Sequence, residues 1–88
     1  MAAKKIIKFY ATWCGPCKVY QKTWDQVIPE YKDQIDVVNI DIDKDVSGFA
    51  AKYKVMSVPT TVLIREDGSE IKKSGRLTAE QLNELILS

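Results

Sequence analysis

Two cysteines separated by two residues are the most reactive feature of this sequence. They are Cys14 and Cys17, in a segment that reads Trp13-Cys14-Gly15-Pro16-Cys17. A thiolate attacks disulfide bonds, and two thiols at this spacing can close into a disulfide, so the pair can exchange electrons with another dithiol. In the expected division of roles, Cys14 attacks a substrate disulfide and Cys17 then attacks the mixed disulfide, which releases reduced substrate.

The same cysteine spacing has two other interpretations. A Cys-x-x-Cys pair is half of a structural zinc site, but zinc needs further ligands. The chain has no histidine and no third cysteine, so only zinc shared across a dimer stays open. Two inert core cysteines are the other alternative, against which the intervening Gly15 and Pro16 argue. We therefore expect no metal, and no cofactor other than the redox-active Cys14–Cys17 disulfide itself.

The segment around the cysteines predicts a strand, a turn and a helix in that order. Residues 5–11 are rich in β-branched and aromatic side chains, which indicates a strand. Pro16 suits the first turn of a helix, because proline lacks the N–H that would go unpaired there. From Cys17 onward apolar residues recur at helical spacing, until Pro29 interrupts or ends the helix. Cys14 would then lie at a helix N-terminus, where unpaired N–H groups and the helix dipole lower the pKa of a thiol.

The remaining segments predict three more strands. Residues 35–42 contain one that is apolar on both faces at Val37-Val38, which predicts a central position in the sheet. Residues 59–65 and 70–75 read as the last two, joined by a hairpin turn at residues 66–69. The polarity of the final strand predicts an edge position.

Two further helices follow from the apolar spacing. One leads from residue 46 through Tyr53, and the other begins after a Thr78 cap. Their expected buried stripes are Val46, Phe49, Ala50 and Tyr53 in the first, and Leu82, Leu85 and Ile86 in the second. Strands that alternate with helices predict parallel pairing, whereas the hairpin must be antiparallel. The predicted fold class is α/β, in the order β-α-β-α-β-β-α, as one domain over residues 1–88 with a four-stranded mixed sheet and helices on both faces.

Several segments together resemble the thioredoxin family. They are residues 9–18 with the Cys-Gly-Pro-Cys motif, residues 51–61 with Val-Pro-Thr, the Asp67-Gly68 hairpin and Ser74-Gly75. They occur in the family's order and with almost the family's spacing, over nearly the whole chain. The resemblance implies a minimal thioredoxin fold and a protein-disulfide reductase activity.

The resemblance also assigns a second half to the site. It implies that the Val58–Pro59 peptide bond is cis, that Pro59 lies against the two sulfurs, and that the Val58 backbone is free to pair with an extended substrate strand. From the residues alone, Pro59 is simply a proline at a strand start. A shallow apolar groove for client proteins is implied at Trp13, Gly15, Pro16, Ser57, Val58 and Gly75. Trp24 is expected to pack inside instead.

Two departures from the family pattern stand out. Only about four residues precede the first predicted strand, where the family usually has a further β-α unit, so the chain is nearer a glutaredoxin in length. Lys8 occupies the position, six residues before Cys14, where the family often buries an aspartate, and Asn39 aligns with that aspartate's lysine partner. Either the Lys8 stem is buried and its amine reaches the rim, or the amine lies beneath the cysteines. In the second case it favours the thiolate or accepts the Cys17 proton, and a favoured thiolate makes the couple more oxidising.

Composition and charge exclude several other classes. The 13 basic and 12 acidic residues are spread along the chain for a net charge of +1, which argues against nucleic-acid binding. No stretch approaches the roughly 20 apolar residues of a membrane helix, and the start of the chain does not read as a signal peptide. We expect a cytoplasmic monomer.

The expected function is reduction of protein disulfides by dithiol exchange. The expected partners are disulfide-containing client proteins, with a thioredoxin reductase as electron donor. A glutaredoxin-like reductase that draws electrons from glutathione is the alternative: chain length favours it, whereas Cys-Gly-Pro-Cys and the absence of paired glycines and an acid around Gly75 do not. A folding oxidase or a pure binding subunit is the third interpretation. An oxidase would usually be exported, and a binding module would not need both cysteines.

Overall fold

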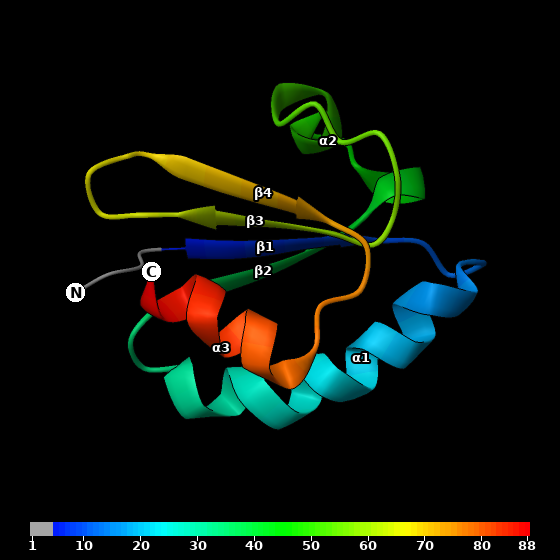
Figure 1. The fold of residues 1–88 in the computed structure, drawn as a ribbon. Coiled ribbons are helices and arrows are strands. Elements are labelled where there is room, and N and C mark those ends of the chain that lie inside the picture. Colours follow the sequence, from blue (N-terminus) through cyan, green and yellow to red (C-terminus); the bar gives the residue numbers. More distant parts are fainter. Residues whose placement is uncertain (1–4) are drawn as a thin grey trace.

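Four strands form one mixed sheet at the centre of the computed structural model, which describes residues 5–88 (Figure 1). They are β1 (Lys5–Tyr10), β2 (Asp36–Asp41), β3 (Thr60–Ile64) and β4 (Glu70–Ser74), in the spatial order β2-β1-β3-β4. β1 and β2 are parallel, whereas β3 is antiparallel to both β1 and β4. The predicted four-stranded mixed sheet is confirmed.

Parallel pairing of the third strand, in contrast, was a wrong prediction. The connection from β2 to β3 contains only a short 3-10 helix η2 (Ile42–Lys44) and the four-residue helix α2 (Phe49–Lys52). Four helical residues rise about 6 Å, whereas a six-residue strand spans about 20 Å. The connection therefore stays at the end of the sheet where β2 finishes, and β3 starts from that end.

Helices cover both faces of the sheet, as predicted. α1 (Gly15–Val27) and α3 (Ala79–Leu87) lie below it in Figure 1, and α2 lies above it. Pro29 ends α1 as expected, because the chain continues only as a 3-10 turn, η1 (Ile28–Tyr31). Thr78 caps α3 through a capping box with Gln81.

The alternation of side chains along β1 divides the core in two. Ile6 packs with Tyr20 and Trp24 of α1 in the larger cluster, which also takes the buried α3 residues Leu82, Leu85 and Ile86. Ile7 and Phe9 point to the opposite face, toward α2. Lys8 shares the face of Ile6, and its Nζ lies 4.9 Å from the centre of the Trp24 ring.

Two positional predictions were wrong. β2 is an edge strand, not a central one: Val37 packs into the cluster under α1 and Val38 into the cluster under α2, so both faces are covered although one edge is open. Val46 is exposed, because the Asp45 carboxylate accepts hydrogen bonds from the N–H groups that begin α2, which leaves Val46 outside the helix. The polar strand β4 does lie at an edge, as predicted.

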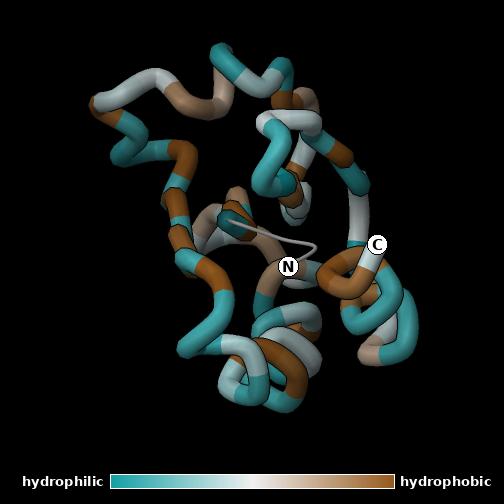
Figure 2. Tube along the Cα trace, turned by 90° about the vertical axis from the view of Figure 1, so that its left-hand side faces the viewer, coloured by the Kyte–Doolittle hydropathy of each residue, from teal (hydrophilic) through white to brown (hydrophobic). Residues whose placement is uncertain are grey.

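Apolar and hydrophilic residues alternate along much of the chain (Figure 2). Among residues 5–88, no helix has the length and apolar character needed to cross a membrane.

Candidate active site: a disulfide at a helix N-terminus

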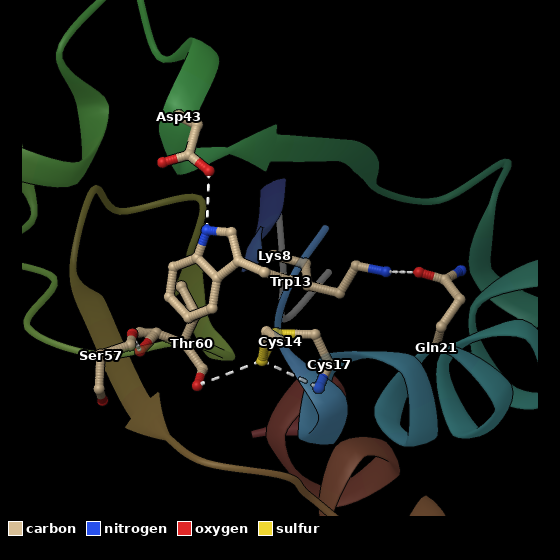
Figure 3. The surroundings of a disulfide bond; sticks show 9 residues. Lys8, Trp13, Cys14, Cys17, Gln21, Asp43, Ser57 and Thr60 are labelled. Carbon is tan, nitrogen blue, oxygen red and sulfur yellow. Dashed lines mark hydrogen bonds between the residues drawn. A yellow bond between two sulfur atoms is a disulfide. The ribbon is translucent and has the colours of Figure 1, made fainter. Parts of the chain in front are cut away.

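The two cysteines are joined in a disulfide at the start of α1 (Figure 3). Their Cα atoms are 5.3 Å apart. Cys14 is the N-cap residue of the helix, and its Sγ accepts a hydrogen bond of 3.1 Å from the backbone N–H of Cys17. Both cysteines are only 5% exposed. When the pair is reduced, this N–H group and the helix dipole stabilise negative charge on the Cys14 sulfur.

The loop before β3 lies directly against the Cys14 sulfur. The Val58–Pro59 peptide bond is cis, as the resemblance implies. The Val58 carbonyl oxygen is 3.7 Å from Cys14 Sγ. Residues separated by more than forty positions in the sequence therefore meet at one end of the sheet, where β1 leads into α1 and the loop enters β3.

Two hydrogen bonds to its backbone carbonyls hold this loop in place. The buried Thr60 hydroxyl donates to the Ser57 carbonyl over 2.6 Å. The Pro59 carbonyl accepts a 2.8 Å bond from the N–H of Gly75, whose φ of +86° favours glycine. These bonds join Ser57, Pro59 and Gly75 to the loop whose Val58 carbonyl lies against Cys14.

Trp13 forms an exposed wall of the site. The residue is 67% exposed, and its indole N–H donates a 2.9 Å hydrogen bond to the Asp43 carboxylate in η2 (Figure 3). Gly15 and Pro16 are also exposed. Trp24, in contrast, is buried and packs edge-on against Tyr20, as predicted.

Lys8 is buried on the α1 side of the sheet. It is 2% exposed, so the interpretation in which its amine reaches the rim is wrong. Its Nζ donates to the Gln21 side-chain oxygen, and Gln21 in turn donates a 2.7 Å bond to Asp25 (Figure 3). Burial lowers the pKa of Lys8 to about 8, although the nearby Asp25 carboxylate acts in the opposite direction.

A hollow of about 410 Å³ opens on the other side of Cys17 from the cis-proline loop. It is lined by Tyr10, Ala11, Thr12, Cys17, Lys18 and Gln21. The described residues contain no cluster of three or more histidine, cysteine, aspartate or glutamate side chains that could hold a metal ion. The disulfide at the N-terminus of α1, beside the Val58 carbonyl, supports dithiol–disulfide exchange at Cys14 and Cys17.

Four residues of this region were missed in the sequence. Gln21 and Asp25 follow Cys17 at intervals of four, so helical spacing could have placed them on the same face of α1. Thr60 directly follows Pro59, but nothing in the sequence indicated that it holds the Ser57 carbonyl. Asp43 is 30 residues from Trp13, and only the folded chain brings the two together.

Comparisons with known proteins agree with this geometry. The family model described as thioredoxin matches residues 1–88. A thioredoxin from Staphylococcus epidermidis is 35% identical over 82 residues, which cover 93% of this chain and 78% of that protein.

Solved structures give the same answer. Oxidised mitochondrial thioredoxin 3 from Saccharomyces cerevisiae has a TM-score of 0.80 and 37% identity, with 97% of this chain and 77% of that chain covered. Thioredoxin from Fasciola hepatica has a TM-score of 0.79 and 32% identity, with 94% and 77% covered. The fold, the cysteine pair and these similarities together show that the chain belongs to the thioredoxin family.

Proposed function

We propose that this chain reduces disulfide bonds in client proteins, with Cys14 as the nucleophile and Cys17 as the resolving cysteine. Membership of the family makes it a thiol–disulfide oxidoreductase that works with disulfide-containing clients and a reductase. The observation that carries the assignment of roles is the position of Cys14, at the N-cap of α1 and 3.7 Å from the Val58 carbonyl.

The proposed reaction transfers two electrons from the cysteine pair to the client. The Cys14 thiolate attacks one client sulfur, a mixed disulfide forms, and the other client sulfur leaves as a thiolate. Cys17 then loses its proton and attacks Cys14 Sγ. The bond between Cys14 and the attacked client sulfur breaks, and that sulfur leaves as a thiolate. The Cys14–Cys17 disulfide is formed in the same step.

Client binding is proposed at the surface around the disulfide. An extended client segment would pair with the backbone of Val58, next to the cis bond. The exposed Trp13 ring would cover the client's apolar side chains, together with Gly15, Pro16, Ser57 and Gly75. Support comes from the hydrogen bonds that hold the Ser57 and Pro59 carbonyls in place on one side of the sulfurs.

We infer that a thioredoxin reductase returns electrons to the pair, and that the protein works as a monomer in the cytosol. A reducing compartment suits a dithiol that must be reduced again after each turnover. The glutaredoxin alternative is not favoured, because the matching family model, the Staphylococcus epidermidis relative and the solved structures described above are all thioredoxins.

Insulin reduction tests the proposed activity and its electron donor together. Purified protein is assayed with NADPH and a thioredoxin reductase, and separately with NADPH, glutathione and glutathione reductase. Turnover with the thioredoxin reductase is expected, and turnover with glutathione alone would contradict the proposed donor. Absence of turnover with either donor would contradict a reductive role.

Cysteine variants test the two roles. Cys17→Ser is expected to accumulate mixed disulfides between Cys14 and its clients, because the resolving attack is lost. The matched variant Cys14→Ser should trap none. Equal trapping by both variants would refute the assignment of Cys14 as nucleophile.

A further inference from the structure

A buried ammonium is the feature of this site that the proposed reaction does not use. Lys8 is the single charged residue in the buried set of the described chain. It projects from β1 toward α1, and its Nζ is surrounded by the Trp24 ring at 4.9 Å, the Tyr10 ring at 5.7 Å and the Gln21 side-chain oxygen.

The hydrogen-bond acceptor of the ammonium lies one helical turn from the resolving cysteine. Gln21, its hydrogen-bond acceptor, follows Cys17 by four residues on α1, which places the two Cβ atoms about 6 Å apart. Both Cys17 and Gln21 line the same hollow, as does Tyr10, whose ring faces the amine. Figure 3 shows the Lys8 side chain directed to Gln21 on the Cys17 side of the disulfide.

We propose that Lys8 is a positioning residue whose buried ammonium stabilises the Cys17 thiolate, and thereby favours the reduced pair and the resolving step. The inference rests on the proposed function, in which Cys17 must lose its proton before it attacks. A thiol as buried as Cys17 resists ionisation unless a positive charge is near. Lys8 supplies that charge from the interior, where water screens it little.

None of the other charged and titratable groups around Lys8 in the described chain supplies a buried positive charge. On α1 they are Asp25, which reaches the amine only through Gln21, and Lys18, which is exposed at the hollow. The strand neighbours of Lys8 are uncharged, namely Asn39 on β2 and Thr61 on β3. Tyr20 donates or accepts a bond with Thr61, and burial raises the pKa of Tyr20 to about 12, so it stays neutral.

The coupling must be reciprocal. If the ammonium stabilises a thiolate, the thiolate stabilises the ammonium by the same free energy. Reduction of the Cys14–Cys17 bond adds two electrons from a dithiol donor, and the sulfurs become thiols by taking up protons or remain as thiolates. Oxidation removes the sulfur charge, and the burial of the ammonium is then offset only by the Gln21 oxygen, the two aromatic rings and Asp25. In the oxidised protein Lys8 has a pKa of about 8, and in the reduced protein its pKa must be higher.

A titration of Lys8 in both redox states tests the proposal on the unaltered protein. The Lys8 Cε signal is followed by NMR from pH 6 to 11, and is assigned by its disappearance in Lys8→Met. The midpoint is expected near pH 8 in the oxidised form and about one unit higher in the reduced form. The same midpoint in both forms would overturn the proposal. The titration requires neither a client nor a reductase, so its outcome does not depend on the proposed function.

The redox equilibrium with glutathione gives a second, independent readout. Lys8→Met is expected to be more reducing than the unaltered protein, by up to about tenfold in the equilibrium constant, because its reduced form loses the stabilised thiolate. Lys18→Met is the matched control, since Lys18 is an exposed lysine beside Cys17 and its loss should leave the equilibrium unchanged. No change in Lys8→Met, or an equal change in both variants, would overturn the proposal. Insulin turnover by the same preparations shows separately whether the proposed function stands.

Discussion

At the residue scale, the buried ammonium of Lys8 lowers the stability of the folded protein close to its cysteines. The cost is offset only in part, by the Gln21 side-chain oxygen, two aromatic rings and the Asp25 carboxylate behind Gln21. Replacing a buried charged group by an apolar one of similar size often stabilises a protein. A residue that lowers stability beside a reactive group is the pattern expected where function and folding compete.

Lys8→Met should therefore stabilise the oxidised protein at neutral pH. The pKa of Lys8 falls from 10.5 to about 8 on folding, so below pH 8 the ammonium is buried at a cost of about 3 kcal/mol, which methionine does not incur. Between pH 8 and about 10 the folded form loses this proton before the unfolded form does, so stability from this group rises with pH. Urea unfolding of both proteins at pH 7 and pH 9.5 measures the difference. It should shrink at the higher pH, and a constant difference would contradict the shifted titration.

The Trp13–Asp43 hydrogen bond is the other residue-scale feature with a measurable consequence. Asp43→Ala frees an exposed indole ring to leave its position beside the disulfide. Because the bond is exposed, the free energy of unfolding should fall by less than about 1 kcal/mol. Insulin reduction should slow through a higher KM, because the ring no longer presents one fixed surface to the client. Asp33→Ala, which removes an exposed carboxylate from the turn before β2, serves as the control and should change neither quantity.

At the scale of elements, local signals predicted the helices and strands, but not the order and direction of the strands in the sheet. The paired valines Val37 and Val38 correctly indicated a strand with apolar contacts on both faces. They could not distinguish an edge from a centre, because that depends on which strand arrives next to it. The direction of β3 was missed for a similar reason: the sequence shows a helix between two strands, but not that this helix is too short to carry the chain back.

The same limit applies to the site. Cys14, Pro16 and Cys17 were placed at the helix start by local rules that hold wherever the helix lies. The contact between Cys14 and Val58 came only from the family resemblance, and the contact between Trp13 and Asp43 was not foreseen. Contacts across the sheet depend on the register of strands, which short-range patterns do not encode.

The α3 cap is the element-scale feature whose removal should be felt in stability but not in redox chemistry. The Thr78 hydroxyl accepts a 3.1 Å hydrogen bond from the N–H of Gln81 in the first turn of α3. Thr78→Ala should therefore lower the free energy of unfolding by about 1 kcal/mol. Ser47→Ala, at an exposed serine before α2, is the control and should be near neutral. Urea unfolding measures both, and a change in the glutathione equilibrium of Thr78→Ala would show that α3 and the site are coupled.

At the scale of the whole molecule, the two faces of the sheet are unequally covered. The cluster under α1 and α3 contains ten buried residues, whereas the cluster under α2 contains three, namely Ile7, Phe9 and Val62. The rest of the α2 side is packed with partly buried side chains such as Phe49 and Tyr53. Less apolar area is removed from water there, so the α2 layer should be the less stable of the two.

Native-state hydrogen exchange of the oxidised protein should resolve this difference. The amides of Lys52 and Tyr53, bonded to the Gly48 and Phe49 carbonyls, should exchange through local opening at a lower free energy than the amides of β1. Lys72 holds this layer to β4, since its Nζ donates to the Lys54 carbonyl over 2.9 Å and to the Tyr53 carbonyl over 3.3 Å. Lys72→Met should therefore lower protection in α2 further while β1 keeps the free energy of global unfolding. If the α2 and β1 amides exchange at one common free energy, the two layers unfold as a unit, and the unequal clusters do not translate into unequal local stability.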